Sequence, residues 1–116
     1  MKVVAVVRDL FFVARIRETA RLVGTPLTFV RTPGEITAAL DAETPTLAIV
    51  DLTTRDWDYE AIFTALAAAP AMPVLGFTTH ALARATQPLH ARCRRVVTKE
   101  ALTQELPALL QHGLAA

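Results

Sequence analysis

The stretch Thr46-Leu47-Ala48-Ile49-Val50-Asp51 decides how this chain is interpreted. A short apolar run with β-branched residues, bounded by Pro45 and by a polar loop, is typical of a strand buried on both faces. Such strands lie at the centre of parallel sheets, and open α/β sheets bind their ligands at the carboxyl ends of these strands. Asp51 is therefore the first candidate functional residue. The simpler interpretation is that Asp51 only ends the strand and accepts a hydrogen bond from the following loop.

The composition narrows the class of protein. With 116 residues, of which 53% are hydrophobic, the chain is long enough for one domain with a real core. Its net charge of +1 gives no electrostatic reason to expect binding to nucleic acid or to a membrane. We therefore expect a single domain over residues 1–116, with no output domain and with neither nucleic acid nor membrane as a partner.

The expected location is the cytoplasm. The apolar run at residues 3–7 is interrupted by charges at residues 8–9, which is too early for a signal peptide, and no stretch reaches the ~20 apolar residues of a membrane span. The single cysteine, Cys93, excludes an internal disulfide and fits a reducing compartment. Three arginines between residues 92 and 95 are interpreted as a solvated rim.

Strand and helix patterns alternate along the chain. Apolar runs predict strands at 3–7, 27–30, 46–51, 73–78 and 96–97, and apolar residues at helical spacing predict a helix after each of them. Thr32-Pro33-Gly34-Glu35 is a strong helix start, and Asp9 and Asp58 are placed to cap the helices that follow them. This alternation predicts an α/β, flavodoxin-like, doubly wound five-stranded parallel sheet of order 2-1-3-4-5, with five helices in a three-layer α/β/α arrangement.

Two prolines bear on the later helices. Pro88 lies inside the predicted fourth helix, residues 81–92, and should kink or shorten it because it removes a hydrogen bond. Pro107 lies in the last helical pattern and is expected to be tolerated only near the first turn of that helix.

The predicted strands end at four polar residues, Asp9, Asp51, Thr78 and Lys99. In a parallel sheet these ends meet at one edge. Two neighbouring carboxylates favour a bound divalent cation or an ammonium group, and Mg²⁺ commonly takes one or two carboxylates. A lysine and a hydroxyl suit the oxygens of a phosphoryl group, and a carboxylate can itself attack phosphorus.

At these residues the chain resembles the receiver domain of two-component response regulators, and the resemblance covers essentially all of it. The matching segments are 6–9, 49–51, 73–80 and 96–99, with Glu105-Leu106 in the last helix. The resemblance implies that Asp51 is the phosphoacceptor, and that Asp9 and Asp51 bind Mg²⁺. It also implies that Thr78 and Lys99 bind the phosphoryl oxygens, within a phosphorelay of two-component signal transduction.

Three positions depart from the receiver pattern. Arg8 replaces the first of two adjacent acids, Val96 replaces the aromatic switch residue, and Glu100 replaces the proline after the lysine. A cation in place of an acid changes the charge beside the metal site by two units, so we expect Mg²⁺ to bind weakly or not at all. We also expect Arg8 to pair with Asp51 or Asp9 and to occupy the site with its own guanidinium.

The sequence leaves two functions open. In the first, the chain is a stand-alone receiver-like signalling module that is phosphorylated on Asp51 and acts through protein–protein interaction. In the second, it is a pseudo-receiver that turns over no phosphate and acts as a protein-interaction module. Its partners would be a histidine kinase or another signalling protein, and a homodimer is left open.

An enzyme is the least favoured of the classes considered. The sequence has no G-x-G-x-x-G motif, P-loop or G-x-S-x-G motif, and its three histidines show no metal-ligand spacing. We therefore expect that the chain is not an enzyme.

Overall fold

A computed structural model describes residues 2–114 of the chain. Over these residues five strands and five helices alternate: β1 Val3–Val6, α1 Leu10–Val23, β2 Leu27–Val30, α2 Pro33–Ala42, β3 Leu47–Asp51, α3 Tyr59–Leu66, β4 Val74–Thr78, α4 Gln87–His90, β5 Arg95–Thr98 and α5 Lys99–His112. The strands form one parallel sheet in the order β2-β1-β3-β4-β5. The predicted fold class and strand order are confirmed.

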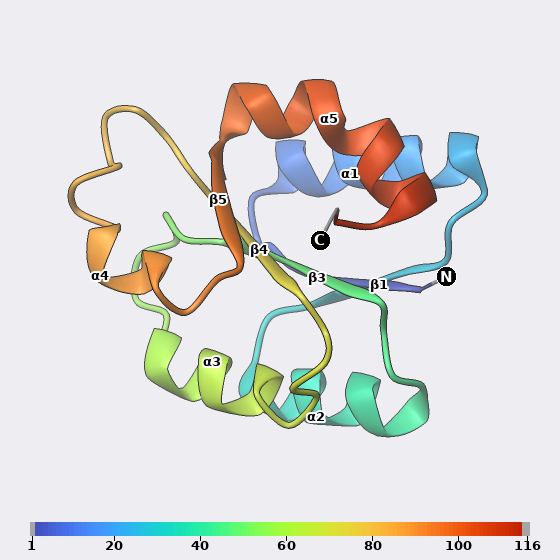
Figure 1. The fold of residues 1–116 in the computed structure, drawn as a ribbon, viewed down its shortest axis with the longest axis horizontal. Coiled ribbons are helices and arrows are strands. Elements are labelled where there is room, and N and C mark those ends of the chain that lie inside the picture. Colours follow the sequence, from blue (N-terminus) through green and yellow to red (C-terminus); the bar gives the residue numbers. More distant parts are fainter. Residues whose placement is uncertain (1, 115–116) are drawn as a thin grey trace.

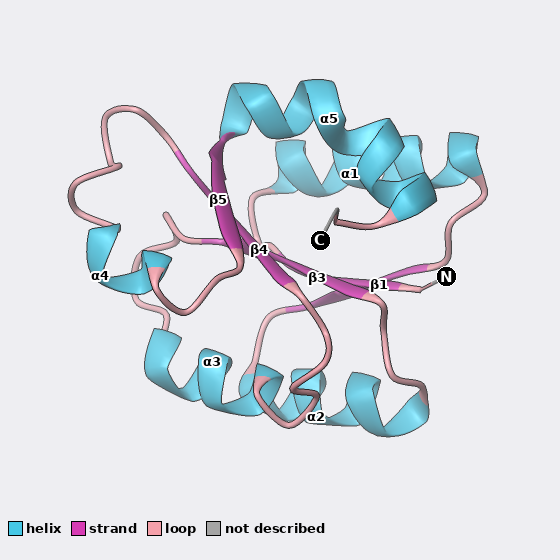
Figure 2. Ribbon diagram, in the orientation of Figure 1, coloured by secondary structure: helices cyan, strands magenta, loops and turns pink. Residues whose placement is uncertain are grey.

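Helices cover both faces of the sheet. Helices α1 and α5 lie on one face, and α2 and α3 lie on the other (Figures 1 and 2). Every residue of β1 and β3 is buried, and the side chains of these strands alternate between two apolar clusters, one on each face of the sheet. This burial on both faces explains why residues 47–50 of β3 are all apolar.

The predicted caps fix where three helices begin. Asp9 Oδ1 accepts hydrogen bonds from the backbone N–H groups of Phe11 and Phe12 at the start of α1. Thr32 accepts from the N–H of Glu35 in α2, and Asp58 accepts from an N–H in the first turn of α3. These side chains satisfy N–H groups that have no partner inside their helices.

The expectation that Pro88 shortens the fourth helix is confirmed, whereas the predicted span of that helix and the expectation for Pro107 are wrong. Helix α4 is only four residues long instead of spanning 81–92, because Pro88 stands in its first turn and residues 80–86 form turns. Pro107 lies well inside α5, which continues to His112, so the expectation that it is tolerated only near the first turn was wrong. Leu106 and Leu110 on either side of it are fully buried, and this packing outweighs the ~3 kcal/mol that an interior proline costs.

The remaining structural expectations concern the surface. Cys93 packs against the cluster under α2 and α3, and burial raises the pKa of its thiol to about 11, so it behaves as a small apolar residue.

Arg92 pairs with Glu60 and Arg95 pairs with Glu105, and both ion pairs are exposed to solvent, as expected for a solvated rim. No helix within residues 2–114 is both long and apolar enough to cross a membrane.

Candidate functional site

The sheet brings the four predicted site residues to one edge. Asp51 is the last residue of β3, Thr78 is the last residue of β4, and Lys99 directly follows β5. Asp9 lies after β1, where it caps α1. The parallel register of β1, β3, β4 and β5 places these positions at the same carboxyl edge of the sheet. Their side chains, however, divide into separate groups of contacts.

Asp51 presents one carboxylate oxygen to a hollow and holds the other fixed. Its side chain is 2% exposed, and Oδ1 accepts hydrogen bonds from the N–H of Thr53 at 2.8 Å and from its hydroxyl at 2.6 Å. Oδ2 forms no hydrogen bond within residues 2–114, and it is not among the fully buried side-chain oxygens of these residues, so it keeps some contact with solvent. The hollow has a volume of about 360 Å³ and is also lined by Arg8, Asp9 and Arg55. This is the geometry of an oriented carboxylate at the wall of a hollow.

Tyr59 fixes the loop that carries this carboxylate. Its hydroxyl lies 2.8 Å from the carbonyl oxygen of Asp51, to which it donates, and it accepts a hydrogen bond from the N–H of Thr54 at 3.0 Å. Burial raises the pKa of Tyr59 to about 12, so the phenol keeps its proton across the physiological range. The sequence interpretation missed Tyr59 and Thr53. The available signal was their spacing, because an aromatic hydroxyl in the first turn of α3 can reach back to the end of β3.

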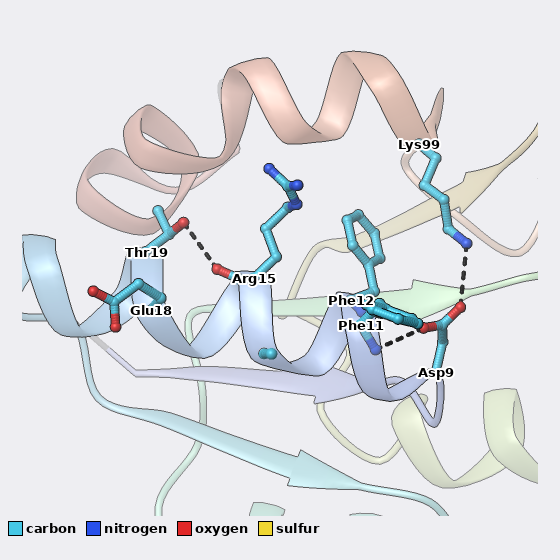
Figure 3. A pocket seen from close by; sticks show the side chains of 8 residues that line it. Asp9, Phe11, Phe12, Arg15, Glu18, Thr19 and Lys99 are labelled. Carbon is cyan, nitrogen blue, oxygen red and sulfur yellow. Dashed lines mark hydrogen bonds and ion pairs between the residues drawn. The ribbon is translucent and has the colours of Figure 1, made fainter.

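Asp9 and Lys99 form an ion pair at the other side of the site. Asp9 Oδ2 lies 3.6 Å from Lys99 Nζ, while Asp9 Oδ1 caps α1 (Figure 3). Lys99 Nζ also lies 5.3 Å from the centre of the Phe12 ring, within cation–π range. Both oxygens of Asp9 therefore have partners within the protein.

The expectation that Arg8 pairs with Asp51 or Asp9 was wrong. Its guanidinium donates a hydrogen bond to the carbonyl oxygen of Arg55 at 3.3 Å and lies 5.8 Å from the centre of the Trp57 ring. Among the described residues no ion pair joins Arg8 to an acid. Asp9 is already paired with Lys99, and the aromatic face and the carbonyl hold the guanidinium beside the hollow instead.

Thr78 is linked to the short helix α4. Its side chain is buried, and its Oγ1 accepts a hydrogen bond from the Thr86 hydroxyl at 3.0 Å. Thr86 is also buried, and its oxygen lies 2.9 Å from His90 Nε2 and 3.0 Å from the carbonyl oxygen of Leu82. The hydroxyl of Thr78, which was predicted to bind the phosphoryl group, is therefore held by Thr86, eight positions later in the chain. The sequence analysis did not anticipate this contact.

Comparison with known proteins was made by sequence and by structure. No protein-family model matches the chain, and no characterised protein matches its sequence. Among solved structures, a response regulator receiver protein from Burkholderia phymatum has 25% identity and a TM-score of 0.72, covering 99% of this chain and 97% of that one. The receiver domain of a sensor histidine kinase from Pseudomonas aeruginosa has 18% identity and a TM-score of 0.74, covering 95% and 93%. The fold is that of a response-regulator receiver domain.

Some matches are longer proteins. NtrX from Brucella abortus has 14% identity and a TM-score of 0.78 over 97% of this chain, which spans only 26% of the NtrX chain. The receiver fold is thus found both alone and as a part of larger proteins. The match describes the shape of the domain, and the activity of this chain has to be argued from its own site.

The receiver fold here fits a divalent cation poorly. The histidine kinase receiver from Pseudomonas aeruginosa holds a magnesium ion in its active-site cleft. In residues 2–114 of this chain, no group of three or more His, Cys, Asp or Glu side chains is placed to hold a metal. Asp9 is engaged by α1 and Lys99, and the charges of Arg8 and Arg55 oppose those of Asp9 and Asp51 around the hollow. Weak Mg²⁺ binding, or none, stays a prediction that rests on these charges.

Replacing Thr86 with valine is expected to destabilise this receiver fold by about 1–3 kcal/mol, because the buried hydroxyl of Thr78 loses its partner. Chemical denaturation followed by circular dichroism measures the change. Thr37→Val is the matched control, since Thr37 donates a similar bond to the carbonyl four residues earlier but is exposed. Equal effects in the two variants would show that the contact between Thr78 and Thr86 contributes nothing beyond that local bond.

Proposed function

We propose that this chain is a receiver-like signalling module in which Asp51 accepts a phosphoryl group and the output passes through protein–protein contacts. The observation that carries the proposal is the asymmetry of the Asp51 carboxylate. Thr53 holds Oδ1 by two hydrogen bonds, whereas Oδ2 forms no hydrogen bond within residues 2–114 and Asp51 lines the hollow at the carboxyl edge of the sheet. An oriented carboxylate with one free oxygen is suited to attack phosphorus.

The transfer uses residues of this chain as follows. Asp51 Oδ2 forms a bond to phosphorus as the bond between phosphorus and the leaving atom of the donor breaks, and the leaving group departs with that electron pair. Lys99 and Thr78 then supply a cation and a hydroxyl to the phosphoryl oxygens. Lys99 has to move from Asp9, and Thr78 has to exchange the hydroxyl of Thr86 for a phosphoryl oxygen. A histidine kinase is the proposed donor, and the chain itself is not proposed to be an enzyme.

The exchange at Thr78 gives a route to the output. Thr86 lies directly before α4, and its hydroxyl also contacts His90 within that helix. Loss of the bond between Thr78 and Thr86 would release one of the contacts that hold α4 against the sheet. We infer that a protein partner would detect the altered position of α4.

A pseudo-receiver is the second candidate, and Arg8 favours it. The guanidinium lines the same hollow as Asp51, and no third acid is present there to help bind a divalent cation. In this case the hollow beside Asp51 and the ion pair of Asp9 with Lys99 would serve the fold and a protein interface, without phosphoryl transfer.

We expect incubation with a small-molecule phosphodonor to add the mass of one phosphoryl group to the protein, and Asp51→Asn to abolish this adduct. Intact-protein mass spectrometry measures it, while Trp57, which lies against Arg8, reports changes at the hollow through its fluorescence. Asp41→Asn is the control, because Asp41 is an exposed carboxylate on α2. Absence of an adduct on the wild-type protein, with and without Mg²⁺, would favour the pseudo-receiver.

A further inference from the structure

Arg8 lines the hollow beside Asp51 but is held there only loosely. It is exposed, its hydrogen bond to the carbonyl oxygen of Arg55 is 3.3 Å long, and its guanidinium lies 5.8 Å from the centre of the Trp57 ring. That distance is close to the limit of about 6 Å for a cation–π contact, and such contacts are weak at exposed positions. Among the described residues Arg8 forms no ion pair. The guanidinium can therefore exchange these contacts for those of an anion that enters the hollow.

The charges around Asp51 are net positive without a divalent cation. Arg8 and Arg55 line the hollow together with Asp9 and Asp51, and Lys99 pairs with Asp9 at 3.6 Å. These three cations and two carboxylates leave one net positive charge. An acid at position 8, as in the receiver pattern, would instead leave one net negative charge, and a divalent cation would be required to attract a doubly negative phosphodonor. In this chain the guanidinium of Arg8 supplies the positive charge itself.

A guanidinium is chemically suited to the oxygens of a phosphoryl group. It stays protonated at every physiological pH, and its planar fork of N–H donors can form two parallel hydrogen bonds to phosphoryl oxygens. Charge-assisted pairs of this kind are about twice as strong as neutral hydrogen bonds, so they are favoured over the single long bond to the carbonyl oxygen of Arg55. A phosphoryl group on Asp51 is thus expected to draw Arg8 away from the Trp57 ring.

We propose that Arg8 takes the place of a divalent cation at this site, so that Asp51 accepts a phosphoryl group without a metal. This role rests on the proposed function, since it requires Asp51 to be the acceptor. With acetyl phosphate as donor, Asp51 Oδ2 bonds to phosphorus while the bond from phosphorus to the acetate oxygen breaks, and acetate leaves with that electron pair. Arg8 binds the phosphoryl oxygens and neither gains nor loses a proton.

Transfer from acetyl phosphate in excess EDTA, followed by intact-protein mass spectrometry, tests the independence from metal. For the wild type we expect the rate of adduct formation in EDTA to lie within about twofold of the rate in Mg²⁺. An adduct that forms only with Mg²⁺, and is absent in Asp51→Asn, would overturn the role of Arg8 and leave the proposed function standing. Absence of an adduct under both conditions would contradict the proposed function as well.

Substitutions of Arg8 separate its guanidinium from the general charge of the surface. Arg8→Gln is expected to slow metal-free transfer about a hundredfold, because it removes a cation placed at the transferring group. Arg8→Lys keeps the charge but loses the fork of donors, so we expect a loss of about tenfold. Arg31→Gln is the matched control, because Arg31 directly follows β2 at the same edge of the sheet, is exposed and does not line the hollow. Equal rates for the wild type and Arg8→Gln, both folded by circular dichroism, would overturn the proposal.

Trp57 gives a readout that does not depend on the rate of transfer. Because Arg8 is expected to leave the Trp57 ring for the phosphoryl group, the fluorescence of Trp57 in EDTA should change in step with the adduct. Arg8→Gln has no guanidinium over the ring, so it should lose most of this change at the same fraction of phosphorylated protein. An adduct on the wild type with no change in fluorescence would show that Arg8 stays on Trp57, and it would contradict the proposal.

Discussion

Replacing Arg8 with aspartate is expected to lower the dissociation constant for Mg²⁺ by about two orders of magnitude. The substitution changes the charge beside the hollow by two units. At about 6 Å, and even with the dielectric constant of water, two units of charge change the energy of a divalent ion by about 3 kcal/mol, and a partly buried site increases this effect. The aspartate would also add a third carboxylate to the region of Asp9 and Asp51.

Saturation of Trp57 fluorescence on titration with Mg²⁺ measures this change, with each variant normalised to its own metal-free signal. Arg31→Asp is the control, because it makes the same change of charge at an exposed residue that does not line the hollow. If Arg8→Asp gains both Mg²⁺ affinity and phosphorylation of Asp51, the arginine is what prevents metal-assisted transfer. If the wild-type protein already binds Mg²⁺ at submillimolar concentration, Arg8 is not the obstacle.

The fold could be predicted because its determinants are local in the sequence. The run ending at Asp51 is buried on both faces, and the caps Asp9, Thr32 and Asp58 begin three helices at the predicted positions. Alternating strands and helices then leave few arrangements of the sheet. The shortening of the fourth helix by Pro88 was also predicted, although not its bounds, whereas the interior position of Pro107 was mispredicted because the packing of α5 decided it.

The sequence predicted where the site residues lie along the edge of the sheet, but not which contacts their side chains make. The strand ends located Asp9, Asp51, Thr78 and Lys99, but some of the contacts around them join residues distant in sequence, such as the ion pair of Asp9 with Lys99. Arg8 reaches the carbonyl of Arg55, 47 residues later. Such contacts depend on the paths of loops, and no periodicity in the sequence encodes them.

The position of Arg8 does not decide between the phosphorylated receiver and the pseudo-receiver. A guanidinium bonded to Asp51 would have blocked the phosphoacceptor directly. Instead Arg8 stays beside the hollow, and Oδ2 of Asp51 forms no hydrogen bond within residues 2–114. The remaining question is one of charge, which is why substitution of Arg8 is the informative experiment.

Truncating Phe77 is expected to produce the largest loss of stability in the described core, about 3–5 kcal/mol for Phe77→Ala. Phe77 lies in β4, its side chain is 0% exposed, and its ring packs edge-on against Phe12 of α1 with 4.8 Å between ring centres. The substitution removes buried apolar surface, leaves a cavity and breaks an aromatic pair worth about 0.5–1.5 kcal/mol beyond its area. Because a domain of this size is typically stable by about 5–15 kcal/mol, the loss is a large fraction of the total.

Phe11→Ala is the matched control, since it makes the same chemical change on α1 at a side chain that is 92% exposed. Its effect on the free energy of unfolding should stay within about 0.5 kcal/mol. Denaturant unfolding of both variants gives the comparison, and Phe77→Leu, expected to cost less than about 1.5 kcal/mol, keeps the test usable if the alanine variant does not fold. Similar losses at residues 77 and 11 would contradict the packing described here, because of these two rings only that of Phe77 is buried. Since Thr78 follows Phe77 directly, such a result would also remove the support that this packing gives to the position of the site.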